Sequence, residues 1–165
     1  MGGCGIISGT NPDMGRSTHV ILLVEDSEDD ADLTLRAFQR GAKSCQVDVV
    51  RDGQEAVDYL FRQGRHAERY PATRPALVLL DLKLPRLCGL EVLRVLRANP
   101  MTSPIPIVVM SCSGEPKDIE ACYRLGANSY VRKPVDFDAF MTTVELLSRY
   151  WLETNTPPPL EGVRG

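Results

Sequence analysis

Short unbroken runs of apolar residues alternate along the chain with longer stretches in which apolar residues recur every three or four positions. The unbroken runs cover residues 20–24, 47–50, 77–80 and 107–110, and a shorter, mixed run covers residues 129–132. An apolar run of this length without alternation predicts a strand that is buried on both faces, as in a parallel sheet. The chain therefore contains five predicted strands.

The stretches that follow these runs predict helices over residues 27–41, 53–61, 89–99 and 115–125, and from residue 136 onward. Ser27 and Asp136 are suitable N-caps, and Gly41 and Gly126 are suitable helix ends. In the last helix the apolar residues keep helical spacing as far as Trp151. Five alternations of strand and helix predict an α/β protein of the flavodoxin-like, doubly wound class, with a five-stranded parallel sheet and helices on both faces.

The segments outside this pattern divide the chain into three parts. Residues 1–17 are rich in small and polar residues and predict a flexible leader. Residues 18–152 form the predicted domain, in which the polar segment 62–75 predicts a long loop. Residues 153–165 contain three consecutive prolines and predict a disordered tail.

Composition narrows the classes of function. The chain has 165 residues and a net charge of −3, which argues against a nucleic-acid-binding surface over the whole protein. No apolar run reaches membrane-spanning length. Five cysteines and two histidines, with no Cys-x-x-Cys pair, argue against a zinc site or a disulfide framework and favour reduced thiols in the cytoplasm.

Reactive side chains follow the ends of the predicted strands. Glu25 and Asp26 follow the first strand, Asp81 the third and Ser111 the fourth, while Lys133 follows the fifth. The carboxyl ends of parallel strands share one edge of the sheet, where ligands bind in folds of this class. Clustered carboxylates repel unless a cation lies among them, and hard oxygen ligands suit Mg²⁺. A metal, an ammonium and a hydroxyl around a free carboxylate are suited to handling a phosphoryl group.

With these motifs in this order, residues 19–151 resemble a response-regulator receiver domain. The resemblance rests on Glu25-Asp26 after an apolar strand, on Asp81 followed by Pro85 and Gly89, on Ser111, and on Tyr130 followed by Lys133-Pro134. Within the family the chain is similar to the small single-domain regulators that serve phytochrome-type histidine kinases. This narrower resemblance rests on the Glu-Asp pair, the loop at 62–75, the segment 133–136 and the extension at 150–152.

The resemblance implies a phosphoacceptor role for Asp81, which would attack a phosphohistidine of a kinase and become an acyl phosphate. It implies that Mg²⁺ is bound by Asp26, by Asp81 and by the backbone carbonyl of Lys83, with Glu25 acting through a metal-bound water.

The resemblance also implies a switch. Lys133 would pair with Asp81 before phosphorylation and with a phosphoryl oxygen afterwards. Ser111 would then hydrogen-bond another phosphoryl oxygen and leave room for Tyr130 to swing inward. The output would be a protein–protein contact, a phosphorelay step or a phosphate-sink role.

Two residues depart from the common family pattern. Glu25 stands where many members have Asp, so we expect a competent metal site with altered geometry. Cys112 follows Ser111 where many members have Ala or Gly, which leaves the dephosphorylation rate open.

The C-terminal end of the last helix carries Tyr150, Trp151 and Leu152 together. Core packing is the first explanation for Trp151, but one helix cannot bury all three side chains. An exposed apolar patch there indicates a partner surface. We therefore expect a homodimer that uses the last helix, the fifth strand and this extension.

Two other classes of function use the same fold. A Mg²⁺-dependent small-molecule phosphohydrolase with an aspartyl-phosphate intermediate usually carries a second acid two residues after its nucleophile, where this chain has Lys83. A flavin-binding electron carrier needs a Ser/Thr/Gly-rich phosphate loop after the first strand, where this chain has the acidic segment 25–30. A signalling phosphoacceptor that is not an enzyme is the favoured interpretation.

Overall fold

The structure, a computed structural model, describes residues 19–41, 45–69 and 74–159. Five parallel strands form one sheet in the order β2-β1-β3-β4-β5. The strands are β1 His19–Val24, β2 Cys45–Val50, β3 Leu77–Leu80, β4 Ile107–Ser111 and β5 Ser129–Arg132. The predicted flavodoxin-like fold is therefore confirmed, although β2 begins two residues before the predicted strand.

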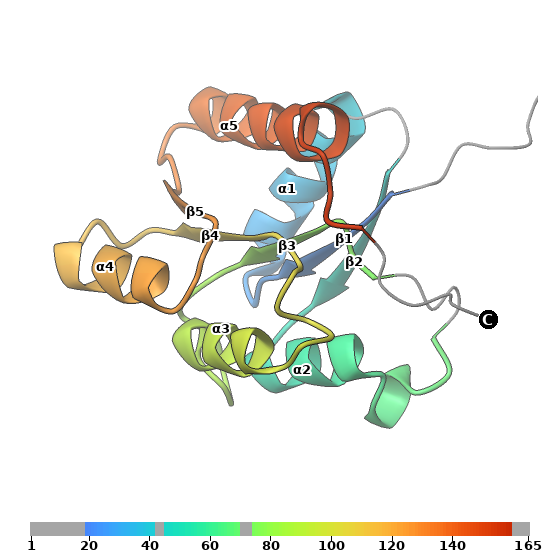
Figure 1. Ribbon diagram of the computed structural model, residues 1–165. Helices are drawn as coiled ribbons and strands as arrows, with labels where there is room; N and C mark the ends of the chain where they lie inside the picture. Colours follow the sequence, from blue (N-terminus) through green and yellow to red (C-terminus); the bar gives the residue numbers. More distant parts are fainter. Residues whose placement is uncertain (1–18, 42–44, 70–73, 160–165) are drawn as a thin grey trace, which may run out of the picture.

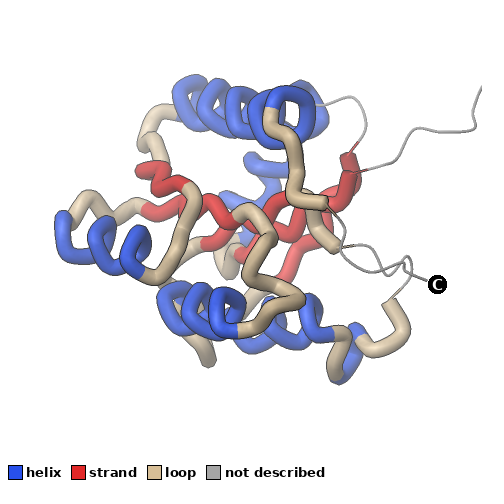
Figure 2. The backbone as a smooth tube through the Cα atoms, in the orientation of Figure 1, coloured by secondary structure: helices blue, strands red, loops and turns tan. Residues whose placement is uncertain are grey.

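Helices follow the strands in turn (Figure 1). They are α1 Glu28–Gly41, α2 Gly53–Phe61, α3 Gly89–Ala98, α4 Pro116–Arg124 and α5 Phe137–Arg149. A π-helical turn, η2 (Tyr150–Thr154), continues α5, and a short 3₁₀ turn, η1 (Gly64–His66), lies in the predicted long loop. The tube in Figure 2 shows the strands as one central layer between helices.

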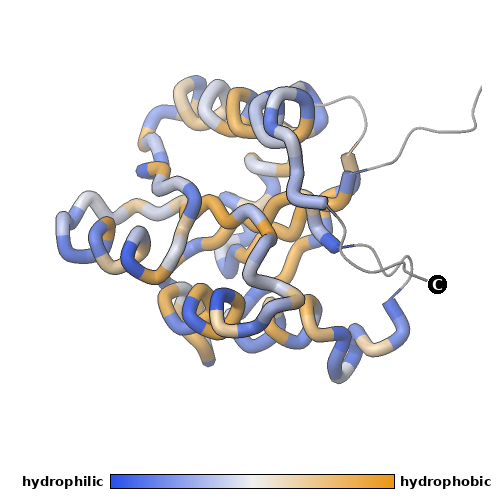
Figure 3. The backbone as a smooth tube through the Cα atoms, viewed as in Figure 1, coloured by the Kyte–Doolittle hydropathy of each residue, from blue (hydrophilic) through white to orange (hydrophobic). Residues whose placement is uncertain are grey.

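The core has two layers, because each central strand is buried on both faces. Leu22, Leu80 and Val109 point to the side covered by α2, α3 and α4, whereas Ile21 and Leu79 point to the side covered by α1 and α5. Figure 3 shows the hydrophobic colours concentrated along the central strands. Burial on both faces explains why these strands are continuous apolar runs without alternation.

The predicted leader, residues 1–17, lies outside the described residues, as do residues 160–165 of the predicted tail. The turn η2 extends to Thr154, past the predicted domain boundary at 152, and residues 155–159 have no regular secondary structure.

Arg97 of α3 ties together the turns that precede β4 and β5. Its guanidinium donates to the carbonyl oxygens of Ser103 (2.8 Å), Ile105 (2.9 Å) and Gly126 (2.8 Å). It also donates to Oδ1 of Asn128 at 2.8 Å. A planar group with five donors suits such a site, which an ammonium could not fill. Because β4 and β5 end at Ser111 and near Lys133, this contact helps to place both side chains.

We expect Arg97→Met to lower the free energy of unfolding by about 2–3 kcal/mol, because four acceptors lose a charged donor. Urea denaturation measures this loss. The control is Arg94→Met, which alters an exposed arginine on the same helix and should change the stability little. Equal stability of the two variants would contradict the structural role of Arg97.

Candidate functional site at the carboxyl edge of the sheet

The ammonium of Lys133 lies among three carboxylates at the carboxyl edge of the sheet. Its Nζ is 2.6 Å from Oε2 of Glu25, 2.9 Å from Oδ2 of Asp30 and 3.1 Å from Oδ2 of Asp81. The Lys133 side chain is only 7% exposed. An ammonium has three N–H donors, so these three acceptors use its whole donor capacity.

The strand ladder brings these residues together. The backbone N–H of Asp81 donates to the carbonyl of Val24, and the N–H of Lys133 donates to the carbonyl of Ser111. The pairing of β1 with β3 and of β4 with β5 thus continues one step past the strands. Residues far apart in sequence therefore reach the same edge.

Gly89, the first residue of α3, lets the helix start close to the backbone of Asp81. A Cβ atom at Gly89 would lie 2.3 Å from the carbonyl oxygen of Asp81. The N–H of Gly89 donates to the carbonyl of Leu82 at 2.9 Å. Any side chain at this position would displace the segment that carries Asp81.

Glu25 is nearly completely buried, with 3% of its surface exposed. Its Oε1 accepts a hydrogen bond from the N–H of Ser27 at 3.0 Å, and its Oε2 accepts from Lys133. Burial raises the pKa of Glu25 to about 7, although the hydrogen bond and charge of Lys133 oppose this shift.

Burial also acts on Lys133, where it would lower the pKa. The hydrogen bonds to Glu25 and Asp30 and the charge of Asp81 outweigh burial and raise the pKa of Lys133 above its usual range. Lys133 is therefore a permanent positive charge at neutral pH.

The negative charge at this edge exceeds what Lys133 neutralises. Carboxylate oxygens of Glu25, Asp26 and Asp81 lie within 4.8 Å of one another. With Asp30, the edge holds four carboxylates and one ammonium, so its formal charge is −3 when all four carboxylates are ionised. Oxygen ligands at this spacing, with unbalanced negative charge, fit a divalent cation.

Lys83 was predicted to supply a backbone carbonyl to the metal. Its backbone N–H donates to Oδ1 of Asp81 at 3.4 Å, so the turn after β3 folds back on the acid. The metal-binding role of the Lys83 carbonyl stays a prediction.

The predicted switch residues Ser111 and Tyr130 are connected through Ser113. Ser111 is 1% exposed, and its Oγ accepts from the N–H of Ser113 at 3.2 Å. The Tyr130 hydroxyl donates to the carbonyl of Ser113 at 2.9 Å. Ser113 also donates through its own hydroxyl to Asp118 of α4 at 2.5 Å. The loop after β4 therefore links both residues to the start of α4.

Sequence reasoning missed Asp30 and Ser113. Asp30 belongs to the acidic segment 25–30, and nothing in its immediate neighbours indicates that it reaches Lys133. Ser113 accepts from Tyr130 through a backbone carbonyl, a group that every residue carries and that no sequence pattern reveals.

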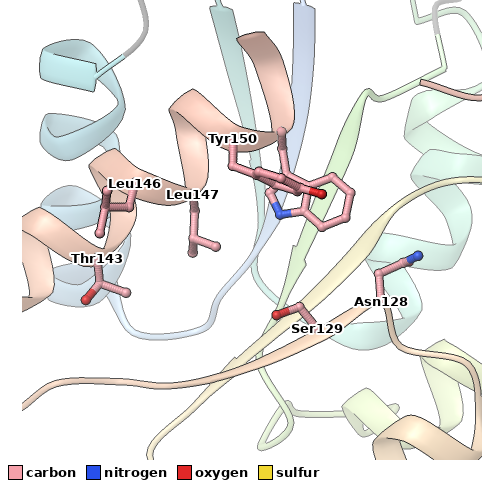
Figure 4. A pocket seen from close by; sticks show the side chains of 7 residues that line it. Asn128, Ser129, Thr143, Leu146, Leu147 and Tyr150 are labelled. Atoms are coloured by element: carbon pink, nitrogen blue, oxygen red, sulfur yellow. The ribbon is translucent and has the colours of Figure 1, made fainter. Parts of the chain in front are cut away.

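Away from this edge, a pocket of about 510 Å³ lies between the end of α5 and the start of β5 (Figure 4). Its lining residues are Asn128, Ser129, Thr143, Leu146, Leu147, Tyr150 and Trp151. Leu146 is 62% exposed and Tyr150 is 50% exposed, whereas Trp151 is half-buried and also packs against the core. The Tyr150 and Trp151 rings meet edge to face with centroids 5.0 Å apart.

This site and fold match a known family. The chain belongs to the response regulator receiver domain family, whose model matches residues 21–145. It is 39% identical to the probable methanogenesis regulatory protein FilR2 of Methanothrix harundinacea, over 84% of this chain and 87% of that protein.

Two further relatives, Rcp1 and RcpA, extend the comparison to solved structures. The chain is 38% identical to the response regulator Rcp1 of Synechocystis, over 84% of this chain and 92% of that protein. The Mn²⁺-bound form of Rcp1 superimposes with a TM-score of 0.80, at 36% identity over 86% of this chain and 99% of that chain. The phosphorylated cyanobacterial phytochrome response regulator RcpA superimposes with a TM-score of 0.81, at 37% identity over 87% of this chain and all of that chain.

Within the described residues, no helix has the length and apolar character needed to cross a membrane.

We expect a divalent cation, Mn²⁺ or Mg²⁺, to stabilise the fold. At ten times its dissociation constant it should add about 1.4 kcal/mol to the free energy of unfolding. Asp26→Asn should lose most of this gain. The control is Asp29→Asn, which removes an exposed acid from the first turn of α1. Equal stabilisation of wild type and Asp26→Asn would place the metal elsewhere.

Proposed function

We propose that this receiver domain accepts a phosphoryl group on Asp81 from the phosphohistidine of a sensor kinase and signals through protein contacts. The observation that carries the proposal is the ammonium of Lys133 within 3.1 Å of Asp81 at the carboxyl edge of the sheet. The match to the receiver family supports it.

In the transfer, an Asp81 oxygen attacks phosphorus, the N–P bond breaks, and its electron pair returns to the imidazole of the kinase histidine. Mg²⁺, held by Asp26, Asp81 and the Lys83 carbonyl with Glu25 acting through a water, would offset the charge of the phosphoryl oxygens. Lys133 donates to one phosphoryl oxygen and Ser111 to another, and Tyr130 follows the movement of Ser111.

The kinase partner is proposed to be of the phytochrome type, because Rcp1 and RcpA are similar over nearly their whole length and RcpA is a phytochrome response regulator.

We place the protein in the cytoplasm and keep the division into a leader (1–17), a receiver (18–152) and a tail (153–165). The phosphohydrolase alternative is not favoured, because the chain belongs to the receiver family and its relatives FilR2 and Rcp1 are regulators.

Incubation with acetyl phosphate and Mg²⁺ tests the phosphoacceptor role. Intact mass spectrometry should show the gain of one phosphoryl group, absent without Mg²⁺ and absent in Asp81→Asn. Asp52→Asn, at the N-cap of α2, is a control that should still gain the group.

Steady release of phosphate without an adduct would favour the phosphohydrolase. If the protein formed no adduct and released no phosphate, that result would contradict both functions.

We further propose a homodimer that buries the pocket between α5 and β5. Leu146 and Tyr150 are exposed beside Trp151, and β5 is an edge strand of the sheet. An exposed apolar patch at the end of a helix is typical of an interface between protein chains.

Sedimentation at micromolar concentration should give a dimer in at least one phosphorylation state. Leu146→Lys should raise the dissociation constant of the dimer at least tenfold, because the substitution places a charge in an apolar contact. The matched control is Val135→Lys, on a fully exposed valine in the loop before α5. A monomer in both phosphorylation states would contradict the dimer.

A further inference from the structure

Asp30 occupies the third position of α1, where an acidic side chain can complete a capping box. In a capping box, the acid at this position accepts from the backbone N–H of the N-cap residue. Here that N–H, of Ser27, donates to Glu25 instead, while the Ser27 hydroxyl accepts from the N–H of Asp30 at 3.3 Å. The carboxylate of Asp30 is thereby left to bind Lys133.

The three partners of Lys133 differ in burial and in distance. Glu25 is closest and has a side chain only 4% exposed, whereas the Asp30 side chain is 34% exposed. Asp81 is the most distant of the three acceptors, at 3.1 Å. Glu25 and Asp30 thus take two of the three N–H bonds, and the remaining one points at Asp81.

We propose that Asp30 is a positioning residue for phosphoryl transfer, because its hydrogen bond, together with that of Glu25, holds Nζ of Lys133 in place with the third N–H directed toward Asp81. This inference rests on the proposed function of Asp81. A hydrogen bond to Glu25 alone would let the flexible lysine stem move Nζ around the Glu25 oxygen, whereas a second bond, to Asp30 on α1, removes that freedom. When Asp81 carries a phosphoryl group, the same N–H meets a phosphoryl oxygen without rearrangement of the lysine.

Two substitutions separate the hydrogen bond of Asp30 from its charge. Asp30→Asn keeps an acceptor oxygen of the same reach but removes the charge, and Asp30→Ala removes both. We expect the Mg²⁺-dependent rate of phosphorylation by sub-saturating acetyl phosphate to fall about tenfold in Asp30→Ala, which corresponds to the loss of one charged hydrogen bond in the transition state. Asp30→Asn should recover the rate to within about threefold of wild type.

The matched control is Asp29→Ala, which removes one acid from the exposed face of the same helical turn and should leave the rate unchanged. Urea denaturation of each variant shows whether it is folded, and the comparison of Asn with Ala keeps the test valid if Ala is less stable. A role in stability alone would not give slow transfer in Ala together with recovery in Asn.

Three results would overturn the inference. An Asp30→Ala variant as fast as wild type would show that Glu25 alone positions Lys133. An Asn variant as slow as Ala would show that the hydrogen bond is not what matters. Faster transfer in both variants would show that Asp30 acts by repelling the phosphoryl donor. Each of these leaves phosphorylation of Asp81 intact, whereas failure of the proposed function would appear as an unphosphorylated wild type.

Discussion

The candidate site depends on the ion pairs between Lys133 and the carboxylates of Glu25, Asp30 and Asp81. Three carboxylates that come from the ends of two strands and the start of a helix would repel one another without the lysine. Burying an ammonium is unfavourable unless its donors are all used, and here each N–H has a carboxylate partner. The lysine and the acids therefore stabilise each other at this edge of the sheet.

Because that arrangement draws on several parallel strands, it also depends on how the strand ends are aligned. The ladder continues past β3 to Asp81 and past β5 to Lys133, and Gly89 allows α3 to begin beside the acid. At the opposite edge, Arg97 holds the turns that lead into β4 and β5. The fold thus fixes the site through backbone pairing, and the remaining excess of negative charge provides the attraction for a divalent cation.

The fold was predictable because strands buried on both faces leave continuous apolar runs, and because Ser27, Asp136 and Gly126 mark helix ends. The convergence of Glu25, Asp26, Asp81 and Lys133 was predictable from the rule that parallel strands share a carboxyl edge. The partnership of Asp30 with Lys133 was not, since it depends on Glu25 taking the N–H of Ser27. When neighbouring side chains compete for the same hydrogen-bond donor, the resulting contact leaves no periodic pattern in the sequence.

The most direct test of the central claim is a crystal structure with Mg²⁺ and beryllium fluoride, a mimic of the acyl phosphate. We predict that the metal lies beside Asp26 and Asp81 and that the beryllium fluoride is bound to Asp81. The Lys133 ammonium should donate to a fluorine atom while it stays hydrogen-bonded to Glu25. Beryllium fluoride bound at another residue, or a Lys133 side chain turned away from Asp81, would contradict the account.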